Sequence, residues 1–237
     1  MLFNINESYV NNVKDLKKEY YNGEPFPCIV LDNFLEGNIL KDIEPSLYNA
    51  FNNISWREEG SFWAQVKKKW AQDPTTLPFA AGAALLFLNS NKTVDFLHKL
   101  TGLTDLVEDA EYNGGGVHCS SSGGSLGIHH DFNYHPRTNM HRRVNVLLYL
   151  NKEWEDTWEG ELELWNKERT QCIKKVKPVF NRAVIFNITD TAYHGFPSPL
   201  KCPEGTNRFS LATYYYTPDR PEEEKSPPHT SVFFKTP

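Results

Sequence analysis

Between Gly114 and Thr217 the chain breaks into short apolar segments, each bounded by glycine, proline or asparagine. Such segments are typical of short β-strands, because these three residue types end strands and form turns. We expect eight strands, at residues 116–120, 125–131, 143–150, 161–165, 173–176, 182–187, 192–195 and 207–216. Eight short strands at this spacing predict a β-sandwich or barrel, and a jelly roll has this number.

The first hundred residues have a different pattern and are expected to be mainly helical, after a short strand in PFPCIVLDNF. An apolar residue recurs every four positions from Ile39 to Phe51, which predicts one apolar helix face that Pro45 should kink or shift. A second helical region is expected over roughly 77–100, broken near Asn89 and with Gly102 as its C-terminal cap. We interpret these helices as packing support for the strands.

A length of 237 residues is enough for one good core, so we expect one domain. The predicted catalytic domain spans 1–217, with helical support over 1–110 and a jelly-roll core over 111–217. Proline and charge dominate residues 218–237, which predicts a loosely held C-terminal tail in which SVFF, residues 231–234, is the segment that could dock.

Charge, cysteine content and hydropathy exclude several classes of protein. A net charge of -5 offers no basic face for a phosphate backbone, so no nucleic acid partner is expected. The four cysteines form no CxxC pair, which favours reduced, structural thiols. The longest apolar run, residues 77–88, is too short to span a bilayer and the N-terminus lacks an apolar signal segment. We therefore expect a soluble, cytoplasmic protein without a membrane partner.

The segment GIHHDFNYHP, residues 127–136, has the composition of a metal site. Residues two apart in a strand point to the same face, so His129 and Asp131 project together while His130 points away. A second histidine further along would complete the two-histidine, one-carboxylate set that leaves open positions on Fe(II). His194, at the end of a predicted strand, is the candidate. An H-x-D tripeptide alone is weak, because it also occurs by chance.

Arg208 strengthens this interpretation. It lies fourteen residues after His194, and Ser210 is expected on the same strand face. An arginine can bind a planar carboxylate through two parallel hydrogen bonds, and a serine hydroxyl can add a third. Such a pair could hold the far carboxylate of 2-oxoglutarate.

With these residues in place, the chain resembles the 2-oxoglutarate and Fe(II)-dependent oxygenases, and within them the prolyl-4-hydroxylase-like branch. The resemblance covers roughly Gly114 to Thr217 and runs in family order through GGGVHCSSSGGSLGIHHDFNYHP, RRVNVLLYLNKEW, WEGELELW, NRAVIFNITDTAYHGFP and NRFSLATYYYT. The fold that it implies is a distorted double-stranded β-helix, a jelly roll of the cupin-like kind with helices packed on one face.

The resemblance also implies roles for individual residues. The metal ligands would be His129, Asp131 and His194. The C5 carboxylate of 2-oxoglutarate would be held by Arg208 and Ser210, with Tyr149 as a further hydrogen-bond donor. One strand earlier, some prolyl hydroxylases carry a tyrosine where this chain has Cys119, which cannot supply that hydroxyl.

The implied activity is hydroxylation of a C–H bond, with O2 and 2-oxoglutarate consumed and succinate and CO2 released. Fe(II) is the implied cofactor and ascorbate a candidate reductant. Asp131 favours hydroxylation, because the related halogenases have a small non-coordinating residue at that position.

Other polar residues near the motif are candidates for substrate contacts. Asn133 and Tyr134 lie where the chain leaves the predicted metal site. Arg142 and Arg143 open a strand, so one should point outward and the other toward the barrel mouth, where a substrate role competes with a surface salt bridge. For His130, His135 and His141 we favour solvent-facing or capping roles.

Three functions remain open at this stage. The first is hydroxylation of a prolyl residue in a peptide or protein, favoured by flanking loops at 133–140 and 196–206 that offer few charges and could wall a groove. The second is the same chemistry on a free amino acid or small metabolite. The third is a non-catalytic metal-binding or sugar-binding jelly roll. The sequence leaves the oligomeric state undetermined.

Overall fold

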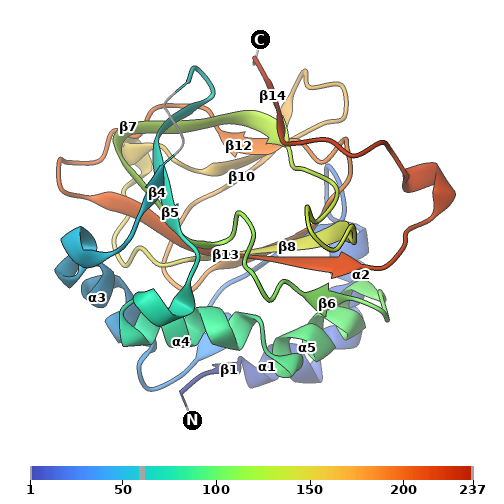
Figure 1. The fold of residues 1–237 in the computed structure, drawn as a ribbon, viewed down its shortest axis with the longest axis horizontal. Coiled ribbons are helices and arrows are strands. Elements are labelled where there is room, and N and C mark those ends of the chain that lie inside the picture. The colour runs from blue at the N-terminus through green and yellow to red at the C-terminus, as the bar shows by residue number, and fades with distance from the viewer. Residues whose placement is uncertain (1, 59–61, 236–237) are drawn as a thin grey trace.

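The computed structural model describes residues 2–58 and 62–235, and its centre is a nearly closed antiparallel barrel (Figure 1). The main path of the sheet runs in the order β10-β9-β12-β7-β13-β8-β11-β2. The strands are β2 (Cys28–Leu31), β4 (Arg57–Glu58), β5 (Gln65–Ala71), β6 (Val107–Glu108), β7 (Gly116–His130), β8 (His141–Tyr149), β9 (Leu162–Trp165), β10 (Cys172–Val176), β11 (Ala183–Asn187), β12 (His194–Phe196), β13 (Asn207–Thr217) and β14 (Val232–Phe234). This is the predicted distorted double-stranded β-helix, and the fold class is confirmed.

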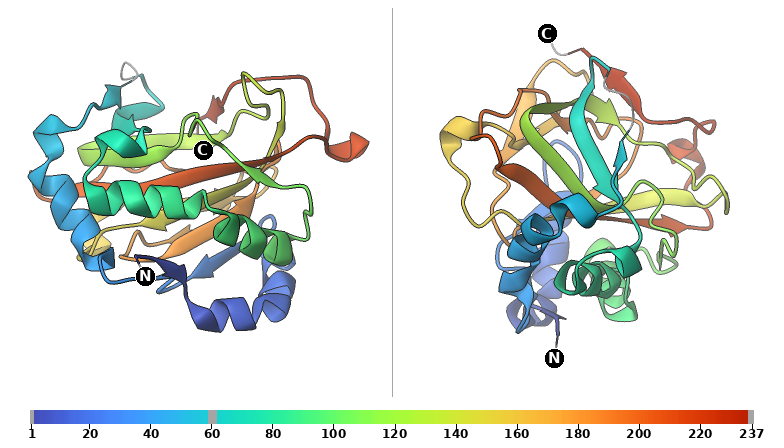
Figure 2. Two further views of the ribbon diagram at one scale, coloured as in Figure 1. Left: turned by 60° about the horizontal axis from the view of Figure 1, so that its bottom comes forward. Right: turned by 60° about the vertical axis from the view of Figure 1, so that its left-hand side comes forward.

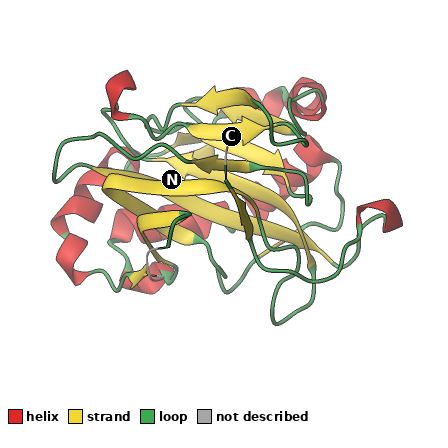
Figure 3. Ribbon diagram, turned by 90° about the horizontal axis from the view of Figure 1, so that it is seen from above, coloured by secondary structure: helices red, strands yellow, loops and turns green. Residues whose placement is uncertain are grey.

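The five α-helices of the described residues lie along one side of the barrel, below β8 and β13 (Figures 1 and 2). They are α1 (Glu7–Asn11), α2 (Val13–Tyr21), α3 (Ile43–Asn49), α4 (Phe79–Leu88) and α5 (Asn91–Thr101). The view from above shows the strands crossing over this helical layer (Figure 3). Beside it, β1 (Asn4–Ile5) pairs with β3 (Leu35–Glu36). No helix in residues 2–58 and 62–235 is both long and apolar enough to cross a membrane.

The alternation of side chains along β8 and β13 divides the interior into two parts. Val144, Val146 and Leu148 of β8 join the core cluster that contains the helices. Successive strand residues point to opposite faces, so Tyr149 of β8 turns into the barrel instead, where Leu162, Leu164 and Phe186 surround it. The same alternation on β13 places Arg208 and Ser210 opposite Phe209 and Leu211, which pack on the helical side. The helices therefore support one face of the sheet, and the other face is free to build a site.

Most of the helices and strands predicted from the sequence are present, but they begin or end at other residues than predicted. The strands expected at 116–120 and 125–131 form one long strand, β7. The helical region at 77–100 is divided into α4 and α5, and α5 is capped by Gly102 at φ 72°. Pro45 falls in the first turn of α3, where a missing N–H costs no helical bond, so the helix starts two residues before it.

The structure differs from the expectation of mainly helical support in the first 110 residues. Residues 65–71 form β5, which pairs with β7 and so belongs to the barrel. β2 likewise extends the sheet beyond β11. The sequence QVKKKWA has little apolar alternation, so its strand conformation depends on pairing with β7 and is not evident from the local pattern.

The C-terminal segment leaves β13, passes through the short helix η5 (Glu222–Glu224) and returns across the barrel to β14 (Figure 1). There Val232, Phe233 and Phe234 pair with His130, His129 and Ile128 of β7. The expectation was a loosely held tail over 218–237, whereas its described part, up to residue 235, is attached by strand pairing. Residues 236 and 237 lie outside the described part.

Candidate metal centre and active site

Three metal-type ligands meet at the end of β7. His129 is the cross-strand partner of His194 on β12, and Asp131 follows β7 directly. The ligand atoms of all three residues lie within 4.8 Å of one another, and all three residues are buried. The structure therefore brings together the set that the H-x-D motif and the distal histidine predicted.

The two histidines are oriented alike. Nδ1 of His129 lies 2.9 Å from the carbonyl oxygen of Gly127, and Nδ1 of His194 lies 2.9 Å from that of Ala192. A carbonyl only accepts, so each Nδ1 carries the proton and each Nε2 presents its lone pair. Each Nε2 lies 3.5 Å from an oxygen of Asp131. Two imidazole lone pairs and a carboxylate facing one point fit a divalent metal of the Fe(II) type.

Electrostatics keep these groups in their ligand forms. Burial raises the pKa of the Asp131 carboxyl, but Arg142 and the two histidines outweigh it and hold that pKa well below its usual range. Burial lowers the pKa of His194 to about 4, so its imidazole is neutral at neutral pH. A carboxylate and a neutral imidazole are the forms that bind metals.

Asp131 is oriented by two residues of β8. Nη2 of Arg142 donates to Oδ2 of Asp131 at 3.0 Å, and Nδ2 of Asn145 donates to the same oxygen at 2.8 Å. Arg142 and Asn145 are three apart, yet they share a face because β8 has one extra residue where its register with Tyr215 and Tyr216 of β13 shifts. Such a bulge re-aims the side chains beside it. Asn145 was not predicted, because a bulge leaves no clear mark in a single sequence.

Arg208 is the second charged feature of the interior. It is buried, Nε donates to the carbonyl of Gly160 at 2.7 Å, and Nη2 donates to the Tyr149 hydroxyl at 3.3 Å. None of the described carboxylates forms an ion pair with it. Burial lowers the pKa of the guanidinium, and Tyr149 only partly opposes this shift. Its guanidinium lies 4.4 Å from the ring centre of Phe196, two residues beyond His194. A buried cation without an anion is costly, so the position suits an anionic ligand.

Ser210 and Tyr149 complete this subsite. They are cross-strand partners on β13 and β8, and both are buried. Burial raises the pKa of the Tyr149 phenol, which therefore remains a hydrogen-bond donor at neutral pH. The structure thus brings Arg208, Tyr149 and Ser210 together, and β13, which carries two of them, is the neighbour of β7, which carries His129.

A cavity of about 870 Å³ opens beside His129 and Asp131. Its walls come from β5, from the loop after β7 and from the C-terminal segment, and include Trp70, Tyr134, Arg142, His229 and Phe233. The loop expected at 133–140 does form a wall. The loop expected at 196–206 does not, because Phe196, Leu200 and Cys202 pack into a separate cluster with Trp154. The C-terminal segment takes that place, and Phe233 stacks on the His129 ring with centroids 4.9 Å apart.

Of the remaining candidate substrate residues, some line the cavity and others contact the C-terminal segment. Tyr134 lines the cavity, whereas Nδ2 of Asn133 donates to the Ser226 hydroxyl and the Pro227 carbonyl, both at 2.9 Å. Arg143 turns away from the cavity and pairs with Glu224 at 3.3 Å. Asn133 and Arg143 therefore hold the C-terminal segment.

The neighbouring histidines, for which solvent-facing or capping roles were expected, are all buried. Nδ1 of His135 accepts from the backbone of Arg137 and Thr138, each at 3.2 Å, so His135 caps its own loop. His141 packs against Tyr134 in a tilted arrangement, with ring centres 4.4 Å apart. His130 faces away from the metal-type ligands, toward the C-terminal segment.

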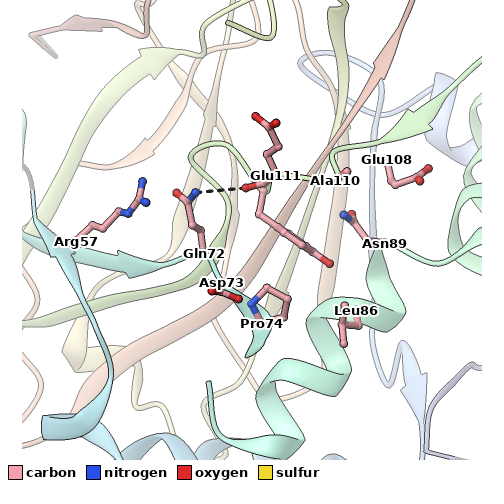
Figure 4. Close-up of a pocket in the computed structure, with 10 residues that line it drawn as sticks. Arg57, Gln72, Asp73, Pro74, Leu86, Asn89, Glu108, Ala110 and Glu111 are labelled. Atoms are coloured by element: carbon pink, nitrogen blue, oxygen red, sulfur yellow. Dashed lines mark hydrogen bonds between the residues drawn. The ribbon is translucent and has the colours of Figure 1, made fainter. Parts of the chain in front are cut away.

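A second hollow, of about 610 Å³, lies between α4 and the end of β5 (Figure 4). Gln72 donates to the carbonyl of Glu111 across it, and Leu86 and Asn89 form its helical side. It contains neither histidine nor cysteine, so its chemistry offers no comparable ligand set.

Comparisons with known proteins agree with this geometry. Residues 115–216 match the family model described as the 2OG-Fe(II) oxygenase superfamily. No curated protein sequence matches the chain.

Several solved structures share the fold. A prolyl hydroxylase from Trichoplax adhaerens, in complex with a hypoxia inducible factor oxygen degradation domain peptide fragment, has a TM-score of 0.63 at 17% identity over 90% of this chain and 94% of that one. A prolyl-4-hydroxylase from Pseudomonas putida has a TM-score of 0.58 at 15% identity, covering 86% and 98%. The non-heme alpha ketoglutarate dependent epimerase of nogalamycin biosynthesis has a TM-score of 0.57 at 10% identity, covering 95% and 96%.

Proposed function

Because the barrel of this chain, residues 115–216, belongs to the 2OG-Fe(II) oxygenase superfamily, we propose that the protein hydroxylates a prolyl residue in a peptide or protein. The observation that carries the proposal is the pairing of the His129, Asp131 and His194 set with an uncompensated buried Arg208 on β13, the neighbour of β7. One group would hold the metal and the other the far carboxylate of 2-oxoglutarate.

The chemistry divides between the cofactors and the chain. Fe(II) with 2-oxoglutarate and O2 supplies hydroxylation of a C–H bond, with release of succinate and CO2. The chain supplies orientation, because Arg142 and Asn145 fix the Asp131 carboxylate and Gly127 and Ala192 fix the two imidazoles. Arg208, Ser210 and Tyr149 would set the direction from which 2-oxoglutarate reaches the metal.

The cavity favours a substrate with an apolar reacting part and polar backbone. Aromatic side chains of Trp70, Phe132, Tyr214 and Phe233 line it. Nη1 of Arg142 is buried and has no hydrogen-bond partner among the described residues, so it is available to a carbonyl group of a bound chain. Among the described residues that line the cavity, Asp131 is the only carboxylate, and Arg142 and Asn145 already bind it, so the amine of a free amino acid would lack a partner. A peptide complex in a protein of the same fold supports the same class.

A small metabolite remains the second candidate, favoured by the similarity to an epimerase of nogalamycin biosynthesis. The third, a non-catalytic jelly roll, would leave the buried Arg208 without a role.

Succinate formation tests the proposal. With Fe(II) and 2-oxoglutarate, we expect proline-containing peptides to raise the rate above the peptide-free rate, and free L-proline to have little effect. Asp131→Ala should abolish the signal by removing a ligand. Stimulation by free amino acids, with no response across a diverse proline peptide library, would move the assignment to the small-molecule reading.

A further inference from the structure

A second group of metal-type ligands lies on the opposite face of β7. His130 comes from β7, Asp190 from the loop between β11 and β12, and His229 from the C-terminal segment. The ligand atoms of these three residues lie within 4.8 Å of one another. His130 is buried and the other two are partly exposed, so water can reach the site.

Both ring nitrogens of His229 face acceptor oxygens, so the ring needs one more proton, or one bound cation, than a neutral imidazole supplies. Its Nδ1 lies 2.8 Å from the carbonyl oxygen of Thr230, and its Nε2 lies 3.0 Å from Oδ1 of Asp190. Both partner atoms are acceptors, and a neutral imidazole has a single N–H. With that proton on Nδ1, the Nε2 lone pair faces a carboxylate, an arrangement that requires a second proton or a bound cation between them.

The orientation repeats that of the first set. His129 and His194 also place Nδ1 on a backbone carbonyl and turn Nε2 toward a carboxylate. In the second group, Nδ1 of His130 faces the carbonyl oxygen of Asp131 at 3.4 Å. Fixing Nδ1 on a carbonyl is how proteins orient an imidazole for metal binding through Nε2.

We propose that His130, Asp190 and His229 form a second divalent-metal site that binds Zn²⁺. Nitrogen and carboxylate oxygen are ordinary zinc ligands, and water would complete the tetrahedral set. The site shares no ligand with the first set, although His229 also lines the cavity beside it, and the inference does not depend on the substrate.

A metal ion at this position would fasten the C-terminal segment to the barrel. Two ligands belong to the barrel and one to the segment, which Asn133 already holds by accepting from the backbone N–H of His229 at 3.0 Å. Four residues further on, Phe233 stacks on His129 in the cavity wall. Occupancy of the second site would therefore stabilise one wall of the cavity beside the first.

Metal counting tests the proposal. The full chain is stripped with a chelator and titrated with Zn²⁺ by calorimetry, and bound zinc is then measured by elemental analysis. We expect two zinc ions per chain in the wild type, one in His229→Gln and one in His194→Ala, with none in the double variant. Glu223→Gln, which changes an exposed carboxylate of the same segment, should retain two.

Two further measurements keep the result interpretable. Asp190→Asn should also bind one ion, which guards against misfolding of a single variant. Zn²⁺ should slow amide hydrogen exchange over 232–234 by about tenfold or more in the wild type and not in His229→Gln. A wild type that binds one ion, or a His229→Gln variant that binds two, would overturn the site. If the proposed function alone is wrong, 2-oxoglutarate will not tighten binding at the first site, while the count of two will stand.

Discussion

Arg142 and Arg208 are both buried in the barrel, but they have different environments. Arg142 pairs with Asp131 at 3.0 Å and lies 3.5 Å from the ring centre of Tyr214. Among the described residues, the hydrogen-bond partners of Arg208 are neutral, namely the Gly160 carbonyl and the Tyr149 hydroxyl. The guanidinium of Arg142 balances the negative charge of Asp131, a carboxylate of the chain itself. That of Arg208 is therefore available for an anion that arrives with a ligand.

The first prediction concerns this unpaired cation. Arg208→Met should weaken 2-oxoglutarate binding by about 2 to 5 kcal/mol, or roughly 30- to 5,000-fold in Kd, because a buried carboxylate would lose its charged partner. Calorimetric titration of Ni²⁺-loaded protein measures this without turnover, and metal content should stay unchanged. Arg182→Met is the matched control, since Arg182 pairs with Asp32 at 2.5 Å on the surface. Equal affinity in wild type and Arg208→Met would show that another group holds the carboxylate.

At the scale of single residues, the sequence predicted those whose partners lie at a fixed spacing along a strand. His129 and Asp131 are two apart and could be paired by strand alternation, and His194 followed from the chemistry of the set. Asn145 and Phe233 could not be found in this way. Asn145 reaches Asp131 only through the β8 bulge, and Phe233 reaches His129 through a strand pairing 104 positions away in the chain.

At the scale of elements, β5 shows how tertiary pairing overrides local pattern. Lys68, Lys69 and Trp70 pair with consecutive residues of β7 although their own sequence is rich in charge. The register shifts beside Lys67, which has a φ of 46° and whose Nζ donates to the Ser122 carbonyl at 2.8 Å. Helix α4, in contrast, is a long apolar run, and α5 is an amphipathic helix that ends at a glycine cap, so both were predicted closely.

Gly116, at the start of β7, allows β5 to lie this close. Its φ is 106°, and a Cβ there would lie 2.2 Å from the carbonyl oxygen of Ala71. Gly116→Ala should lower the free energy of unfolding by about 2 to 4 kcal/mol, because backbone strain and a steric clash add. Urea unfolding of the metal-free protein at pH 7 measures the loss.

Gly205→Ala separates the cost of backbone strain from the cost of the steric clash. Gly205 has a φ of 85° but nothing within 4 Å of a Cβ, so its substitution should cost only about 1 kcal/mol of backbone strain. Equal losses in the two variants would contradict the role given to the close approach of β5 and β7.

At the scale of the whole molecule, the cavity is assembled from distant parts of the chain. Its walls take residues from β5, from the loop after β7 and from the C-terminal segment at 228–233. We propose that 1–217 form one catalytic domain and that the segment after it serves as a strap across the barrel. Composition predicted a loose tail here, because proline and charge dominate it. The contacts that attach it, from Asn133, Arg143 and β7, are all long-range and carry no local pattern.

The stability of the metal-free molecule should depend on pH through His118 of β7. Nε2 of His118 donates to the carbonyl of Gly114 at 2.9 Å, and burial, aided by Lys68, lowers the pKa of His118 to about 3. The unfolded chain, with an ordinary histidine pKa of about 6.5, binds this proton more readily than the folded one. The contribution of His118 to stability is therefore complete above about pH 6.5 and is lost as the pH falls toward 3.

The resulting prediction compares wild type with His118→Gln, which keeps an N–H donor but does not titrate. Between pH 7 and pH 5 the wild type should lose about 1 to 2 kcal/mol more unfolding free energy than the variant, since each pH unit below the unfolded pKa costs up to about 1.4 kcal/mol and the side chain is partly exposed. Urea unfolding at several pH values, in chelator, gives both curves. Above pH 7 they should run parallel, because His118 is then neutral in both states. Parallel curves down to pH 5 as well would mean that the wild-type histidine accepts a proton without loss of the Gly114 contact, and that the pH response originates elsewhere in the barrel.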